Sequence, residues 1–132
     1  MQGAKGARGH FQVLNRTRGK VLADRAQTAG SFISRLLGLM GRAHFPEGEA
    51  LHLSPCNGVH TFFMRLPIDV LVLDGERRVL KALAALPPWR ATPLYPGARS
   101  VLELPAGVIQ ASGTAVGDQL DFQDAPGQPG VF

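Results

Sequence analysis

Glycine and proline interrupt this chain so often that it has room only for short secondary-structure elements. The 132 residues include 16 glycines and 10 prolines. Glycine favours turns, and proline lacks the amide hydrogen that helix interiors and central strands require. Hydrophobic residues make up 45% of the chain and charged residues 18%, a balance typical of globular proteins. The sequence therefore predicts a β-rich globular fold with many turns.

The length suits one domain with one core. We expect a single β-rich domain at residues 11–123, with a flexible basic tail at residues 1–10 and a second flexible tail at residues 124–132. The single cysteine cannot form an intramolecular disulfide, and no Cys/His array suggests a structural zinc site or another cofactor. No apolar stretch approaches the roughly 18 residues of a membrane span, and no secretory signal is visible, so we expect a cytoplasmic protein.

Alternating apolar residues bounded by turn residues predict six or more short strands. These strands are carried by FQVLN, KVLADR, ALHL, IDVLVLD, RVLKALAAL, SVLEL and QLDFQ. Residues 28–38 have helical spacing, with Thr28 as a cap and Gly38 at the end, and residues 105–113 suit one or two helical turns. The predicted fold class is mainly β, a jelly-roll-like sandwich or partly open barrel with one short amphipathic helix and one helical turn. No phosphate-binding glycine motif indicates a βαβ nucleotide fold.

Two acidic residues stand inside apolar strands. Asp69 lies in IDVLVLD, where it shares a face with Leu71 and Leu73, and Glu103 shares a face with Val101 in SVLEL. A buried charge without a partner costs several kcal/mol or raises the pKa of the carboxyl. Arg42 and Arg65 are the candidates for structural ion pairs.

The functional hypothesis joins these acids to a histidine. His60, Asp69 and Glu103, with Cys56 nearby, could form a polar pocket that binds a ligand or a divalent metal, or performs acid/base chemistry. The alternative is structural, with the acids accepting backbone hydrogen bonds or pairing with arginines. Cys56 could act as a nucleophile with His60 only if a turn at Asn57 and Gly58 brings the two together, and a buried structural thiol is the alternative.

Aromatic residues give a second candidate site. Trp89 and Tyr95 lie in a proline-rich loop, residues 87–97, where they could stack on a sugar or anchor a partner protein. Trp89 could equally cover a sheet edge. We expect Phe62, Phe63 and Met64 to serve core and rim packing, with a cofactor site as the alternative. We expect His52 to face solvent because it alternates with leucines.

The basic residues are concentrated near the amino terminus. Residues 1–25 contain six basic residues against Asp24 alone, which would suit an anionic surface or a nucleic acid. This strip matches no nucleic-acid-binding module, and a solvated tail and strand face is the alternative.

Four ordered blocks resemble one family. GLMGR (38–42), FFMRLPIDVLVLD (62–74), VLELPAG (101–107) and VGDQLDF (116–122) are similar to the prokaryotic domain of unknown function 192. The resemblance covers residues 25–122 and implies a compact, mainly β domain without an assigned reaction. Phe63 stands where many relatives have tryptophan.

These observations lead to three hypotheses for function. The first is a binding or accessory domain for a small ligand or a protein partner, using His60, Asp69, Glu103, Trp89 and Cys56. The second is a small metal-dependent or acid/base hydrolase using the same polar residues. The third is a binder of anionic surfaces or nucleic acid through residues 1–25.

Overall fold

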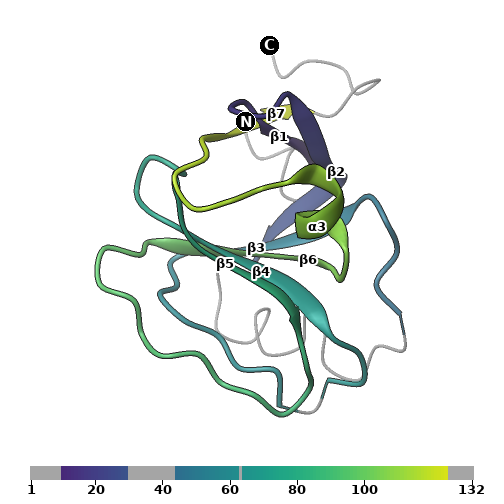
Figure 1. The fold of residues 1–132 in the computed structure, drawn as a ribbon, viewed down its shortest axis with the longest axis vertical. Coiled ribbons are helices and arrows are strands. Elements are labelled where there is room, and N and C mark those ends of the chain that lie inside the picture. The colour runs from purple at the N-terminus through teal and green to yellow at the C-terminus, as the bar shows by residue number, and fades with distance from the viewer. Residues whose placement is uncertain (1–9, 30–43, 63, 125–132) are drawn as a thin grey trace.

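Seven strands form one strongly curled sheet in the computed structural model, which describes residues 10–29, 44–62 and 64–124 (Figure 1). The strands are β1 (Phe11–Asn15), β2 (Lys20–Ala29), β3 (Glu49–Leu53), β4 (Ile68–Leu73), β5 (Val79–Leu86), β6 (Ser100–Pro105) and β7 (Leu120–Asp124). Their order in the sheet is β5-β4-β6-β3-β2-β1-β7. Neighbours are antiparallel except for the parallel pair β2 and β3.

The curl brings the two edges of the sheet together at one end. Arg78, just before β5, forms an antiparallel bridge with Gln119, just before β7. Val79 N also donates a hydrogen bond to Asp118 O at 2.9 Å. The fold is therefore a partly open barrel, as the strand-rich sequence predicts.

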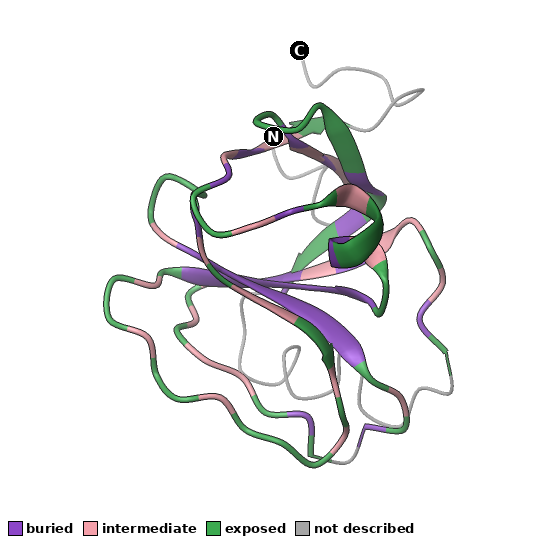
Figure 2. Ribbon diagram, viewed as in Figure 1, coloured by how far each residue is buried: buried purple, intermediate pink, exposed green. Residues whose placement is uncertain are grey.

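The sheet is buried on both faces at its centre, and Figure 2 shows β4 buried along its length. The side chains inside the curl form an inner cluster of Val13, Leu22, Ala23, Ala26, Ala50, Leu71, Leu73, Val79, Leu102, Leu104, Ile109 and Leu120. The opposite face carries an outer cluster of Ala29, Phe45, Leu53, Met64, Ile68, Val70, Val72 and Val101. Period-two alternation in the sequence predicts this division of β4 into two apolar faces.

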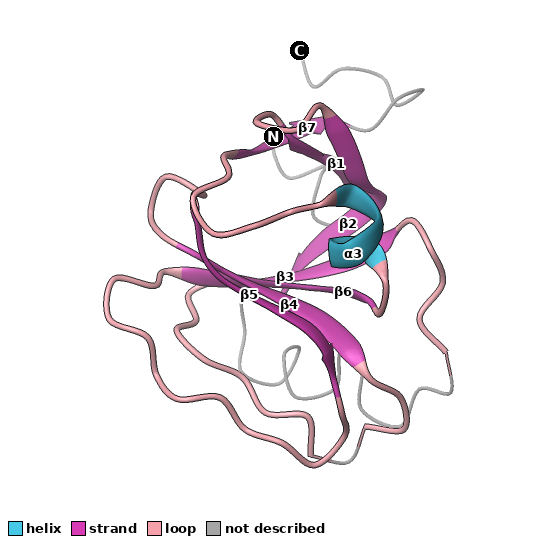
Figure 3. Ribbon diagram, in the orientation of Figure 1, coloured by secondary structure: helices cyan, strands magenta, loops and turns pink. Residues whose placement is uncertain are grey.

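The helical turn and the long loops lie on opposite faces of the sheet. Helix α3 (Val108–Ser112) contributes Ile109 to the inner cluster, whereas Val59 and Tyr95 from the loops pack on the outer cluster (Figure 3). The predicted helix at residues 28–38 lies outside the described residues except for its first two positions. Thr28, predicted to cap that helix, instead lies in β2. In the described part of the chain, no helix is long and apolar enough to cross a membrane.

Candidate functional site

Asp69 binds backbone amides. It is fully buried and pairs in register with Leu104, on the inner face. Oδ1 accepts a hydrogen bond from Ala85 N at 2.7 Å, and Oδ2 accepts hydrogen bonds from Gly107 N at 3.1 Å and Ile109 N at 2.8 Å. Its carboxylate therefore connects the end of β5 and the start of α3 to β4. This is the structural alternative for Asp69, in which the acid accepts backbone hydrogen bonds.

Glu103 lies on the other face, in the outer cluster. It is 5% exposed, and in the sheet it stands between Leu51 on β3 and Val70 on β4. Among the described residues, no hydrogen bond or ion pair reaches its carboxyl. Burial raises the pKa of Glu103 to about 8, because the ionised form would lose its hydration without compensation. The protein thus accommodates this acid by keeping it protonated at neutral pH.

The predicted polar pocket is not assembled. Asp69 and Glu103 point to opposite faces of the sheet, and His60 is exposed on a loop. In the described ranges, no three His, Cys, Asp or Glu side chains gather closely enough to hold a metal ion. Arg65 is exposed and pairs with neither acid, and Arg42 lies outside the described residues.

Cys56 does not meet His60. Its thiol donates a hydrogen bond to Gly58 O at 2.9 Å, and the residue packs against the outer cluster. His60 Nδ1 accepts a hydrogen bond from Phe62 N at 3.2 Å instead. The geometry therefore favours the structural alternative for this cysteine.

His60 belongs to an exposed stack of three aromatic rings. The centroids of His60 and Phe62 lie 4.7 Å apart with planes inclined by 28°, and those of Phe62 and Trp89 lie 5.8 Å apart with planes inclined by 27°. Phe62 is 39% exposed and Trp89 57%. We call residues 58–62 and 87–94, which carry this stack, the aromatic loop face.

A β-type contact between the two loops explains the stack. His60 and Ala91 form an antiparallel bridge, which sets Phe62 across from Trp89. Residues two apart on one segment and opposite each other on paired segments share a face. The three rings therefore lie together although about 30 residues separate the two loops in sequence.

Thr61, which is buried beneath the exposed rings, connects the two loops by hydrogen bonds. Its N donates to Arg90 O at 2.7 Å, and its carbonyl accepts a hydrogen bond from Trp89 N at 3.0 Å. Its Oγ1 donates to Pro87 O at 2.7 Å and accepts from Arg90 N at 2.9 Å. These four bonds fix the backbone on which the rings stand.

Trp89 adopts a left-handed backbone conformation with φ of 63°. For a bulky residue this conformation costs about 1–3 kcal/mol, and it persists only where the surrounding structure enforces it. Residues with such backbone strain cluster at functional sites. The bonds from Thr61 supply that enforcement.

Sequence reasoning found two members of the stack and missed the third. The prediction that Phe62 serves packing overlooked its exposure, although the alternation of His60 and Phe62 was a usable signal. The expectation that His52 faces solvent is wrong. It is 5% exposed on the inner face, where Nδ1 lies 3.1 Å from Thr28 Oγ1 and Nε2 has no hydrogen-bond partner among the described residues.

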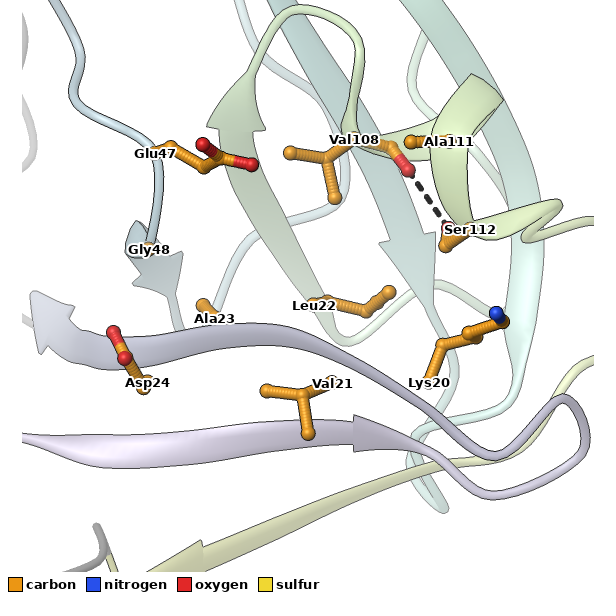
Figure 4. Close-up of a pocket in the computed structure, with 10 residues that line it drawn as sticks. All are labelled: Lys20, Val21, Leu22, Ala23, Asp24, Glu47, Gly48, Val108, Ala111 and Ser112. Carbon is orange, nitrogen blue, oxygen red and sulfur yellow. Dashed lines mark hydrogen bonds between the residues drawn. The ribbon is translucent and has the colours of Figure 1, made fainter.

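Two hollows lie away from the predicted residues. A groove of about 260 Å³ between β2 and α3 has Lys20 at one end and Asp24 and Glu47 at the other (Figure 4). A wider hollow of about 630 Å³ is lined by Ser54, Pro55, Asp74, Gly75, Glu76, Gly97 and Arg99. Neither contains His60, Asp69, Glu103, Trp89 or Cys56.

Two arginines of the basic amino-terminal strip form ion pairs within the protein. Arg18 Nε lies 2.8 Å from Asp118 Oδ2, and Arg25 contacts Asp24 at 3.0 Å and donates to Glu47 O at 2.9 Å. These contacts reduce the charge that the strip could offer to an anionic surface.

Proteins of archaea are similar over most of the chain. A UPF0127 protein of Pyrococcus furiosus is 36% identical over 115 residues, 83% of this chain and 97% of the relative. A UPF0127 protein of Thermococcus sibiricus is 34% identical over 119 residues, 84% of this chain and 74% of the relative.

Two bacterial crystal structures share the fold. A protein of unknown function from Novosphingobium aromaticivorans has a TM-score of 0.72 and 23% identity, covering 85% of this chain and 83% of that one. A protein from Sinorhizobium meliloti, described as a proposed transcription regulator, has a TM-score of 0.73 and 18% identity, covering 86% and 92%. The model of the family described as Uncharacterized ACR, DUF192, matches residues 13–122, and the chain belongs to this family.

Proposed function

We propose that this protein is a binding module and that the aromatic loop face is its ligand-binding surface. The observation that supports this most directly is the stack of His60, Phe62 and Trp89, which stands exposed at the surface. Exposed aromatic faces can bind planar, sugar or apolar groups by stacking, with a gain of about 0.5–1.5 kcal/mol beyond area burial for an aromatic pair.

The surface is also prepared for binding. The hydrogen bonds of buried Thr61 hold both loops in place, so a ligand need not order them. Preorganisation of this kind lowers the entropic cost of association. Three of the large hydrophobic side chains exposed in the described residues, Phe62, Trp89 and Leu94, lie on this face.

The other two hypotheses have less support. A hydrolase using His60, Asp69 and Glu103 would need the three to converge, and they lie on different parts of the molecule. The likeness to the Sinorhizobium meliloti protein, at 18% identity, extends to the fold alone. A nucleic-acid binder would have to work through a strip whose Arg18 and Arg25 are already engaged.

Fragment binding followed by two-dimensional NMR tests the location of the site. A library of small aromatic and sugar fragments should shift the side-chain NH of Trp89, the single tryptophan, and the amides of residues 58–62 and 87–94. Phe62→Ala should abolish these shifts, because it removes the middle ring of the stack.

Val116→Ala is the matched control, because Val116 is also a well-exposed hydrophobic residue but lies outside the loops. Fragments that bind mainly in the groove between β2 and α3, or that bind Phe62→Ala as well as the native protein, would contradict the proposed surface.

A further inference from the structure

We propose that the partner of the aromatic loop face is an acidic polypeptide segment that carries apolar side chains. This inference rests on the proposed function and specifies the class of ligand. It follows from the charge and the composition of the two longer loops, residues 54–67 and 87–99, that contain the aromatic loop face.

The two loops contain no acidic residue and no lysine. Their charged residues are Arg65, Arg90 and Arg99, accompanied by His60. The centres of protein–protein interfaces are enriched in aromatic residues and arginine and depleted in lysine, aspartate and glutamate. Tryptophan, tyrosine and arginine also dominate the residues that contribute most binding energy. The composition of the loops is therefore that of an interface.

Two arginines of these loops, Arg65 and Arg90, have no carboxylate partner among the described residues. Arg65 and Arg90 are both exposed, and no carboxylate within the described residues forms an ion pair with either. The acids nearest in the sheet are unavailable, because Asp69 is held by three amides and Glu103 is buried in the outer cluster. A guanidinium group can bind a carboxylate through two parallel hydrogen bonds. Carboxylates of a partner would thus complete this surface.

The apolar part of the surface favours a polypeptide over a nucleic acid. Leu94 is 71% exposed on the same loop as Trp89. An aliphatic side chain has no charge or hydrogen-bond donor for a phosphate and stacks poorly on a base. It packs well against the apolar side chains of a peptide. Single-stranded nucleic acids also bind in grooves with a continuous positive charge, and the isolated exposed arginines at positions 65 and 90 do not form one.

Peptide selection on the intact protein tests the inference. A random peptide library displayed on phage is panned against the full chain, and selected peptides are synthesised with a fluorescent label for anisotropy measurements. We expect selected peptides to combine Asp or Glu with Phe, Leu or Trp, and to bind Arg90→Glu roughly tenfold more weakly, about 1.4 kcal/mol per factor of ten. Replacing the acids of the peptide by lysine should restore binding to Arg90→Glu.

The controls separate charge from location. Arg16→Glu makes the same charge change at an exposed position beside β1, so it should leave peptide affinity unchanged apart from a small effect of net charge. Arg90→Glu keeps the backbone hydrogen bonds to Thr61. Folding of each variant is checked by the fluorescence of Trp89.

The outcomes distinguish this inference from the proposed function. Selected peptides without an acidic bias that still lose binding on Phe62→Ala would overturn the acidic partner and leave the binding surface standing. Selected peptides whose affinity is unchanged by both Phe62→Ala and Arg90→Glu would overturn the acidic partner and the binding surface together. Tighter, salt-sensitive binding of an oligouridylate probe through Arg90 would also overturn the polypeptide assignment.

Discussion

Among the described residues, two buried ionisable side chains, one on each face of the sheet, have pKa values shifted toward their neutral forms. Glu103 lies on the outer face and His52 on the inner face. Both are neutral at neutral pH in the folded protein, because burial opposes the charged form of each. They therefore couple folding stability to pH in opposite senses.

The first prediction concerns Glu103. Its pKa is about 8 in the folded protein and 4.5 in the unfolded chain, so the folded state holds an extra proton between these values. The free energy of unfolding should therefore fall as pH rises from 4.5 to 8. Glu103→Gln should remove this loss and be more stable than the native protein by a few kcal/mol at pH 8, but not at pH 4. Urea unfolding at both pH values checks this, and equal stabilities at pH 8 would contradict it.

The second prediction concerns His52. Burial, and secondly the charge of Arg77, lowers its pKa from 6.5 to about 4. Between pH 6.5 and 4, His52 is therefore protonated in the unfolded chain but neutral in the folded protein. The free energy of unfolding should fall as pH falls through this range, by about 3 kcal/mol in all. His52→Leu should flatten this part of the profile. A flat profile in the native protein would refute the assignment.

At the scale of elements, Asp69 connects three pieces of backbone. The pairing of β4 and β5 shifts register between Ile68 and Val70, and Ala85 in this bulge has a φ of 52°. Extra residues in a bulge lose ladder hydrogen bonds. Asp69 accepts the amide hydrogen of Ala85 together with two amide hydrogens at the start of α3, where Gly107 has a φ of 107°.

Asp69→Asn should destabilise the fold by about 2–4 kcal/mol, because one acceptor becomes a donor facing buried amide donors. Asp24→Asn is the matched control. Its pair with Arg25 is half exposed, so we expect a change below about 1 kcal/mol. Urea unfolding of both variants measures the difference, and similar losses in the two variants would show that the three amide bonds contribute little.

At the scale of the whole molecule, a buried polar network closes the curl of the sheet. Asn15, at the end of β1, donates hydrogen bonds to Asp118 Oδ2 at 2.9 Å and Thr114 Oγ1 at 3.0 Å, and its Oδ1 accepts one from Arg18 N. The bonds to Asp118 and Thr114 connect residues about a hundred positions apart in the chain. The segment that they fix also carries the bridge of Gln119 with Arg78.

Asn15→Ala should therefore destabilise the fold by about 2–3 kcal/mol, since it removes a fully buried side chain that makes three hydrogen bonds. Gln12→Ala removes an exposed hydrogen bond between β1 and β7, Gln12 to Gln123, and should cost less than about 0.5 kcal/mol. Thermal and urea unfolding compare the two, and the prediction fails if Asn15→Ala unfolds like the native protein.

Much of the fold could be predicted from the sequence, because strand alternation is local. The two apolar faces of β4, the face shared by Glu103 and Val101, and the position of the strands all follow from a period of two residues. The β-rich class follows from the frequency of glycine and proline. The prediction that His52 faces solvent was wrong because β3 is buried on both faces, so alternation with leucines does not imply exposure.

The local sequence pattern is enough to place Asp69 and Glu103 in apolar strands, where each carboxyl must be accommodated. The way each is accommodated depends on the folded structure: one carboxylate accepts three amide hydrogens, and the other stays protonated. The structure likewise decided that His60 and Trp89 meet through Phe62, because the bridge between His60 and Ala91 joins loops that are distant in the chain. Local periodicity specifies faces, whereas partners across the sheet and between loops depend on which distant segments the fold brings into contact.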